Sequence, residues 1–365
     1  MPVTSISDMF GVTSRIGMEL RGSNLLARPV EYIGVELELE QADLNLRGDR
    51  IRWPQDEATA RALIDTHNDG SLRNGIELVF RQPLFGQQAL AAIDTMFEIK
   101  QINNLTDSVR TSTHVHINYS DVGAEVVTRV AALNAIVEPY IVGTAGTHRE
   151  ANCYAVSMRG SDFLTHRRVN YNVSDFVINQ TGSHRYLGFN MAALAKYGTI
   201  EYRYFGGLDR NGVVALVNML LEQKTMALSS VNFLAIVEQY DTIRDFIFNE
   251  LPHAAAFLKL DSVSREDDIA WRDEVLLRLQ SANAFCSAFN LDTYDEETDE
   301  EVPEPEHYDE PEQLESDPPG PEDAVFTRDL NTFANQAGID RYTDLLNRAA
   351  AAAGSAGAVL STRVR

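Results

Sequence analysis

The chain has 365 residues, enough for one large domain or two ordinary ones, and its apolar content of 44% is typical of a globular protein. Much of its formal net charge of −23 comes from residues 292–323, which hold 16 Asp or Glu and no Lys or Arg. This acidity argues against nonspecific binding to nucleic acid. Two distant cysteines, Cys153 and Cys286, lack metal-ligand spacing and argue against a disulfide framework.

The amino-terminal half predicts alternating strands and helices. Residues 1–27 have weak periodicity and are expected to form an accessory arm. After the arm, strands are indicated by alternation of apolar and polar residues, and helices by apolar spacing of three and four. In chain order these patterns predict a strand over 32–40, a short helix over 56–65, a strand over 75–80, a helix over 86–102 and a strand over 113–118.

The following elements are predicted in the same way. Ser120 or Asp121 is expected to cap a helix that runs to about residue 142, and a polar segment follows over 148–184. The remaining patterns predict strands over 186–190 and 199–205 and helices over 211–248 and 271–289.

Composition divides the chain into an arm (1–27), a folded domain (28–290), an acidic linker (291–323) and a carboxy-terminal helix and tail (324–365). The linker is expected to be disordered because it is too poor in apolar residues to offset chain entropy. A predicted helix over 326–353 has an apolar stripe. This helix would either dock a protein partner or have no role, and the sequence favours neither alternative. No signal peptide or run of about 20 apolar residues is apparent, so we expect a cytoplasmic protein without a membrane segment.

Charged side chains share one face on three of the predicted strands. Successive strand residues point to opposite faces, so Glu36 lies with Glu38 (and Glu40), His114 with His116 (and Asn118), and Glu201 with Arg203. The alternate positions are apolar or aromatic and are expected to face a core: Val35, Leu37, Leu39, Val115, Ile117, Ile200, Tyr202 and Tyr204. Carboxylates, imidazoles and a guanidinium on one face suit divalent-metal and phosphate chemistry.

Each pattern also has a simpler interpretation. Glu36 and Glu38, about 7 Å apart along a strand, repel each other unless a cation lies between them, but a solvated edge strand would also tolerate them. Glu77 is acidic inside an apolar strand and needs a partner, either a metal shared with Asp69 of the preceding turn or an arginine. The pair Glu201 and Arg203 is equally compatible with a weak surface ion pair.

Six short motifs in order resemble the amidoligase family. They are GVELE from Gly34, NDGS with GIELV from Asn68, HVHIN from His114, REANCY from Arg149, HRY with Asn190 from His184, and GTIEYRYF from Gly198. The family belongs to the carboxylate–amine ligase superfamily of glutamine synthetase and glutamate–cysteine ligase. The resemblance covers about residues 30–219 and implies an α+β fold, with a curved, funnel-like antiparallel sheet and helices packed outside.

The resemblance also implies roles for particular residues. The metal ligands would be Glu36, Glu38, Glu77 and Glu201, to which the turn adds Asp69. His114, Arg203 and Arg185 would be catalytic, and His116 would join Arg203 and Arg185 in binding the cofactor. The substrate would be bound by Arg149, Asn118, Asn152 and Asn190. Departures from the family pattern, Phe80-Arg81 after the second strand and Ser112-Thr113 before His114, concern the substrate pocket more than the proposed ligands.

The reaction implied is ATP-dependent. ATP with Mg²⁺ or Mn²⁺ would phosphorylate a carboxylate, and an amine would attack the acyl phosphate to form an amide. The substrates would be small molecules or peptides, including cell-wall fragments. A metal-dependent hydrolase using His114 and His116 is an alternative from another enzyme class. A non-enzymatic adaptor or assembly protein acting through the carboxy-terminal tail is a third.

Overall fold

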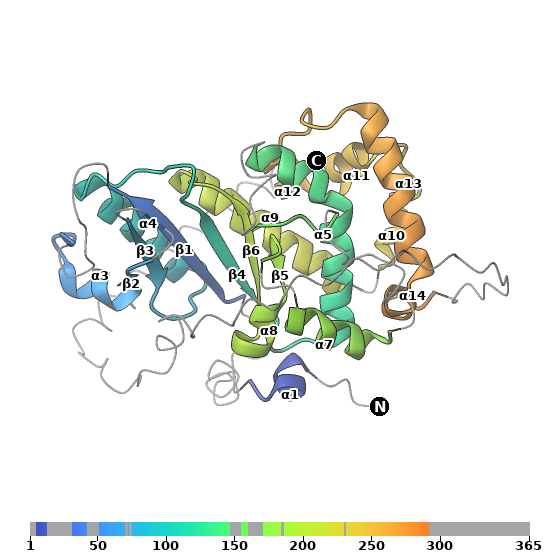
Figure 1. Cartoon of the computed structure of the whole chain (residues 1–365), viewed down its shortest axis with the longest axis horizontal. Coiled ribbons are helices and arrows are strands. Elements are labelled where there is room, and N and C mark those ends of the chain that lie inside the picture. The colour runs from blue at the N-terminus through green and yellow to red at the C-terminus, as the bar shows by residue number, and fades with distance from the viewer. Residues whose placement is uncertain are drawn as a thin grey trace, which may run out of the picture. The chain divides into compact units, whose positions relative to one another are not determined.

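The computed structural model is shown in Figure 1. It describes residues 5–12, 31–41, 51–69, 72, 75–146, 155–159, 171–183, 186–229 and 231–291. All of these lie in one compact unit, Met1–Thr293. The predicted tail helix and nearly all of the predicted linker lie outside the described residues, so both remain predictions, as do the domain boundaries.

The described strands form one open, six-stranded antiparallel sheet, which makes the fold a mixed α and β one. Its order is β2-β3-β1-β4-β6-β5, so β2 and β5 are the two edges. The strands are β1 (Ile33–Glu40), β2 (Ile64–His67), β3 (Gly75–Phe80), β4 (Thr113–Asn118), β5 (Phe189–Asn190) and β6 (Thr199–Phe205). The strand that carries Glu36 and Glu38 is therefore central.

Helices cover the apolar face of the sheet. In Figure 1, α4 (Gly86–Ile102) and α9 (Arg210–Leu228) lie behind the strands. Every alternate position assigned to the core from strand parity is at most 3% exposed, which confirms that prediction. Polar residues of the opposite face, such as His114 and Glu201, are only 3% and 6% exposed. These two polar side chains are therefore largely shielded from solvent.

The longest described helix, α5 (Ala124–Ala145), packs against α7, α9, α13 and α14. By length and composition it would be able to cross a membrane, although no such run was expected from the sequence. Its most apolar window is 78% buried inside the fold, as in the core helix of a globular protein.

Several predicted boundaries are wrong in the amino-terminal half. The helix expected over 56–65 ends at Leu63, as α3 (Glu57–Leu63), and the chain continues directly into β2, which was not predicted. β2 exists because residues 64–67 pair with β3. The helix expected from Ser120 or Asp121 begins after Gly123, because Ser120 instead closes a turn onto Asn118.

Side-chain caps explain most of the later differences. The helical pattern over 211–248 is divided into α9, α10 (Phe233–Val237) and α11 (Ile243–Glu250), because Asn232 and Thr242 each cap a new helix. Ser264 starts α13 (Arg265–Ser281) earlier than expected, and α14 (Asn283–Phe289) follows as a separate helix. Three further helices in the described part of the chain, none of them predicted, are α7 (Val173–Ser183), α8 (Ala192–Tyr197) and α12 (Pro252–Phe257).

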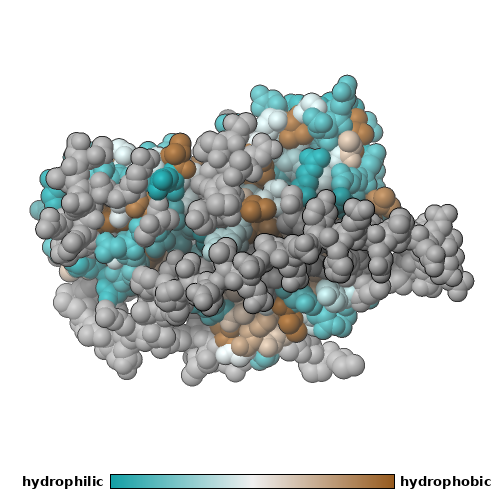
Figure 2. Space-filling model, in the orientation of Figure 1, coloured by the Kyte–Doolittle hydropathy of each residue, from teal (hydrophilic) through white to brown (hydrophobic). Residues whose placement is uncertain are grey.

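The described part of the amino-terminal arm is anchored. A capping box between Ser5 and Asp8 starts α1 (Ile6–Phe10), and the side chain of Ile6 is fully buried. The Ser7 amide and hydroxyl both donate to the carbonyl of Ser120, at 3.0 and 2.8 Å. The arm therefore braces the turn that follows β4. Figure 2 shows an apolar area where α1, α7 and α8 lie in Figure 1, whereas the surface over α11 and α13 is mostly hydrophilic.

A buried carboxylate ties α5 to β6 and to residues 155–159. Glu138 is 1% exposed and accepts hydrogen bonds from the Met158 amide (2.6 Å), the Arg159 amide (2.8 Å) and the Tyr204 hydroxyl (2.6 Å). Burial raises the pKa of this carboxyl, against the hydrogen bonds that favour its ionised form. Glu138 thus joins three segments, one of them the strand of Glu201 and Arg203.

Replacing Glu138 by alanine is expected to lower the free energy of unfolding by about 2–4 kcal/mol, because the buried Met158 amide and the Tyr204 hydroxyl lose their acceptor, as does the partly buried Arg159 amide. Urea denaturation monitored by circular dichroism would measure the change. Glu98→Ala, at an exposed position of α4, is the matched control and is expected to stay within about 0.5 kcal/mol of the wild type. A Glu138→Ala variant as stable as this control would show that the network does not hold the three segments together.

Candidate metal and phosphate site

The strand register brings the predicted acidic and histidine residues into adjacent rows. Glu38 on β1 is directly opposite Glu77 on β3, and Glu36 is directly opposite His114 on β4. Directly opposite residues project from the same face, with Cβ atoms about 4.5–5.5 Å apart. The carboxylates and the imidazole therefore meet over the centre of the sheet.

A further row crosses the other half of the same face. His116 on β4 is directly opposite Glu201 on β6, and Glu201 is directly opposite Asn190 on β5. The register of β4 and β6 shifts between Thr113 and Val115, so the pairing is irregular beside His114. A shift of this kind re-aims the neighbouring side chains, here those of His114 and Arg203.

Glu36 lies between the two histidines. Its Oε2 is 3.2 Å from His114 Nδ1, and its Oε1 is 3.2 Å from His116 Nε2. His116 is oriented from its other nitrogen, because Nδ1 lies 3.0 Å from the hydroxyl of Thr199. The Glu36 side chain keeps 24% of its surface exposed, whereas that of His114 keeps 4%. Glu36 is thus the most accessible member of this trio.

Glu201 is held by two donors. The Arg203 guanidinium donates to Oε1 at 2.5 Å, and the Asn190 amide donates to Oε2 at 2.7 Å. Oε1 also lies 3.4 Å from His114 Nδ1. The orientation of the Glu201 carboxylate is therefore set by one donor on its own strand, Arg203, and by one on the adjacent strand β5, Asn190.

Ser112 joins Glu38 to His114. Its hydroxyl donates to Glu38 Oε2 and lies 2.9 Å from His114 Nε2. The same imidazole nitrogen is 3.8 Å from Glu38 Oε1. His114 thus has carboxylates on both sides, which places it at the centre of the cluster.

The charges of the cluster depend on one another. Burial opposes ionisation of Glu36, but His116 and His114 outweigh it and hold the pKa of Glu36 well below its usual range. Burial likewise opposes charge on His116, yet Glu36 raises the pKa of this imidazole. For Glu201, Arg203 outweighs burial and lowers the pKa. Glu36 and Glu201 are therefore held in the ionised form by their cationic neighbours.

The side chains fall into two groups with metal-ligand geometry, and Glu36 belongs to both. One group is Glu36, His116 and Glu201, and the other is Glu36, Glu77 and His114. The ligand atoms within each group lie within 4.8 Å of one another. Opposite ligands of a metal with bonds of about 2.1 Å would be about 4.2 Å apart, so small adjustments would suffice. His116 Nε2 and Glu36 Oε1 are only 3.2 Å apart, so both atoms could bind the same cation.

Other predicted site residues take different positions. Asp69 is described but belongs to neither ligand group. The amide of Asn118 donates to Asp121 at 3.1 Å, and its oxygen accepts from the Ser120 amide and hydroxyl, so it holds the turn after β4. Arg149, Asn152 and Arg185 lie outside the described residues. The roles of these residues remain predictions.

Three residues of this face were missed in the sequence. Ser112 and Thr199 have the parity of His114 and Glu201: Thr199 already lies in the predicted strand over 199–205, and extending the strand over 113–118 by one residue would have included Ser112. His67 is directly opposite Glu77, but only the register of β2 against β3 reveals this. No alternation within the four residues of β2 points to it.

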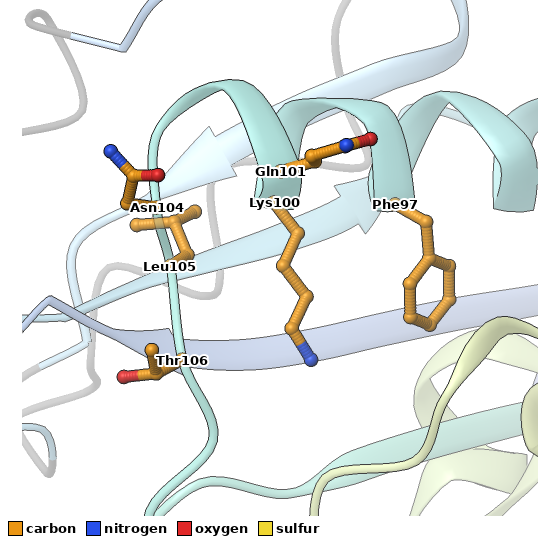
Figure 3. A pocket seen from close by; sticks show the side chains of 6 residues that line it. All are labelled: Phe97, Lys100, Gln101, Asn104, Leu105 and Thr106. Carbon is orange, nitrogen blue, oxygen red and sulfur yellow. The ribbon is translucent and has the colours of Figure 1, made fainter.

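A separate hollow lies at the carboxyl end of α4. Figure 3 shows its lining, which includes Phe97 and Lys100 of α4 and Thr106 of the following segment. The Lys100 ammonium is paired with Asp107 at 2.7 Å. No residue predicted for the site lines this hollow, so the functional argument rests on the sheet face alone.

Comparison with known proteins adds little. No model of a protein family matches the chain, and no curated protein does. Among solved structures, a bifunctional glutathione synthetase from Pasteurella multocida aligns with 9% identity and a TM-score of 0.33, over 76% of this chain and 50% of that one. The chain thus spans about half the length of that protein. A similarity at this level carries no argument about function.

Proposed function

We propose that this protein is an ATP-dependent carboxylate–amine ligase that forms an amide through an acyl phosphate. The observation that carries the proposal is the pair of ligand groups sharing Glu36, with Arg203 beside them on one sheet face. The resemblance of the six motifs to the amidoligase family supports the same reading. On this proposal the open sheet is the floor of a glutamine-synthetase-type funnel in a cytoplasmic enzyme.

Divalent cations, Mg²⁺ or Mn²⁺, would neutralise the charge on the ATP phosphates. Glu36, His116 and Glu201 would hold one, and Glu36, Glu77 and His114 the other. Arg203, whose side chain is 21% exposed, keeps Glu201 in place, and its guanidinium would supply positive charge beside a phosphoryl oxygen. Asn190 holds the second oxygen of Glu201, so that carboxylate does not rotate away.

The proposal is tested with the full chain, ATP, Mg²⁺ or Mn²⁺, pooled amino acids and dipeptides as carboxylates, and methylamine or ammonia as the amine. We expect ADP and phosphate to appear only when metal and carboxylate are present with an amine, whether added or carried by the amino acids and dipeptides themselves. Phosphorus NMR and chromatography of the nucleotides would measure the products, with EDTA as the control. Formation of AMP and pyrophosphate would contradict the acyl-phosphate mechanism.

A metal-dependent hydrolase is the second candidate. It is favoured by the two imidazoles, His114 and His116, on either side of Glu36, because imidazole is a better ligand for zinc than for magnesium. It gives no role to the pairing of Arg203 with Glu201. Metal-dependent cleavage of a peptide or ester in the same pools, without consumption of ATP, would favour the hydrolase and overturn the ligase.

A further inference from the structure

Glu38 lies on the same sheet face as the two ligand groups but belongs to neither of them. Its Oε2 instead accepts a hydrogen bond from the hydroxyl of Ser112. The oxygen of this hydroxyl also lies 2.9 Å from His114 Nε2. We call Glu38, Ser112 and His114 the orienting set, because in it a carboxylate reaches an imidazole through a hydroxyl group.

The hydrogen bonds of the orienting set have one consistent direction. A serine hydroxyl has a single proton, and a carboxylate can only accept. Because the proton of Ser112 is donated to Glu38, the Ser112 oxygen can only accept from His114. Nε2 of His114 therefore carries the proton of the neutral imidazole, and Nδ1 keeps a lone pair.

Nδ1 of His114 faces two carboxylates. It lies 3.2 Å from Glu36 Oε2 and 3.4 Å from Glu201 Oε1. A lone pair and carboxylate oxygens repel one another at these distances, and a cation among them makes all three ligands. His114 belongs to the ligand group of Glu36 and Glu77. The position of the proton and the positions of the carboxylates therefore agree on Nδ1 as the ligand atom.

The surroundings of the orienting set maintain this direction. Each of the three residues is at most 8% exposed, so water has little access as a substitute partner. The Glu38 amide donates to the carbonyl of Ser112 at 2.9 Å, which ties the two backbones together. If the imidazole turned over, the Ser112 oxygen would lose a donor in a buried place, and such a loss is costly.

His116 is arranged in a similar way. Its Nε2 lies 3.2 Å from Glu36 Oε1, and its Nδ1 lies 3.0 Å from the hydroxyl of Thr199. Both imidazoles thus turn one nitrogen toward Glu36 and the other toward a hydroxyl group. At His114 the donation from Ser112 to Glu38 also fixes which ring nitrogen carries the proton.

We infer that Glu38 is a positioning residue, which acts through Ser112 to keep the proton of His114 on Nε2 and the lone pair of Nδ1 directed at a cation. The inference rests on the proposed function for that cation. It gives Glu38 a role different from the direct metal ligand that the amidoligase resemblance implies. Residues that orient a metal-binding histidine contribute about 10- to 100-fold to metal affinity.

The first test measures metal affinity and requires no turnover. Ser112→Ala is expected to weaken Mn²⁺ binding to the full chain by about 10- to 100-fold, whereas Ser112→Thr, which keeps a hydroxyl, is expected to stay within about threefold of the wild type. Electron paramagnetic resonance would measure both. Ser287→Ala is the matched control, because the exposed Ser287 also donates to a side chain, that of Asn283, and is expected to leave the affinity unchanged. Circular dichroism and the melting temperature would show that each variant is folded.

The second test distinguishes positioning from direct ligation by Glu38. Glutamine at this position can donate to Ser112, so the Ser112 proton is free to point at His114 and the direction is lost. Glu38→Gln is expected to weaken Mn²⁺ binding by about 10- to 100-fold, and adding Ser112→Ala is expected to weaken it less than about threefold further, because both changes act through His114. If the two losses multiply, Glu38 acts on the cation independently of Ser112 and the inference is overturned.

The third test locates the proton. The protein is labelled with ¹⁵N-histidine and saturated with Mg²⁺, and the His114 signals are identified by their absence in His114→Gln. We expect nitrogen–proton correlation spectra to place the ring proton of His114 on Nε2 in the wild type, and this preference to be lost in Ser112→Ala. A proton on Nδ1 in the Mg²⁺ complex of the wild type would overturn the inference.

The outcomes separate this inference from the proposed function. Mn²⁺ binding without ATP consumption would contradict the ligase, while a loss of affinity of about tenfold or more in Ser112→Ala would still support the inference. ATP consumption by the wild type together with an unchanged Mn²⁺ affinity in Ser112→Ala would overturn the inference alone. A wild type that binds neither Mn²⁺ nor Mg²⁺ would overturn both.

Discussion

Replacing Glu36 by glutamine is expected to lower metal-dependent ATP turnover at least about 1,000-fold, because the side chain belongs to both ligand groups. Glutamine keeps the size of the side chain but loses the negative charge that would neutralise part of the charge of two cations. Binding of Mn²⁺, followed by electron paramagnetic resonance, is expected to weaken by about 100-fold or more. Steady-state release of ADP would measure the catalytic loss.

A control lies on the same strand. Glu40 ends β1 with the same parity as Glu36, but it belongs to neither ligand group. Glu40→Gln is expected to retain turnover and Mn²⁺ affinity within about threefold of the wild type. If Glu36→Gln behaves like Glu40→Gln in both assays, Glu36 does not bridge two cations and the proposed site is wrong.

Replacing Arg203 by alanine is expected to lower kcat by about 100- to 1,000-fold, because a guanidinium aimed at a transferring phosphoryl group acts mainly in the transition state. The KM for ATP is expected to change much less. Arg203→Lys should recover only part of the loss, since lysine restores the charge without the planar fork that also holds Glu201. Steady-state kinetics with saturating metal would separate kcat from KM.

Arg210 supplies the comparison for Arg203. It also pairs with a carboxylate, Asp94, at 2.7 Å, but both side chains are exposed and lie outside the sheet face. Arg210→Ala is expected to change kcat less than about threefold, since exposed ion pairs contribute little. A kcat for Arg203→Ala close to that of Arg210→Ala would remove Arg203 from the proposed mechanism.

Strand parity could be predicted from the sequence, because the side-chain period of a strand is two whatever its neighbours are. Alternation alone placed Val35, Leu37 and Leu39 in the core and Glu36 with Glu38 on the other face. Helix boundaries were less predictable. A continuous apolar spacing over 211–248 does not show that Asn232 and Thr242 will cap new helices, since each cap requires a turn of the chain.

The sequence by itself determined which residues share a face on β1, β4 and β6, and hence the chemical character of the candidate site. Only the tertiary structure decided which of these residues meet. The contact of Glu36 with both histidines depends on the pairing of β1 with β4, and the position of His67 beside Glu77 depends on the pairing of β2 with β3. Register is set by contacts between strands far apart in the chain, and no local pattern encodes them.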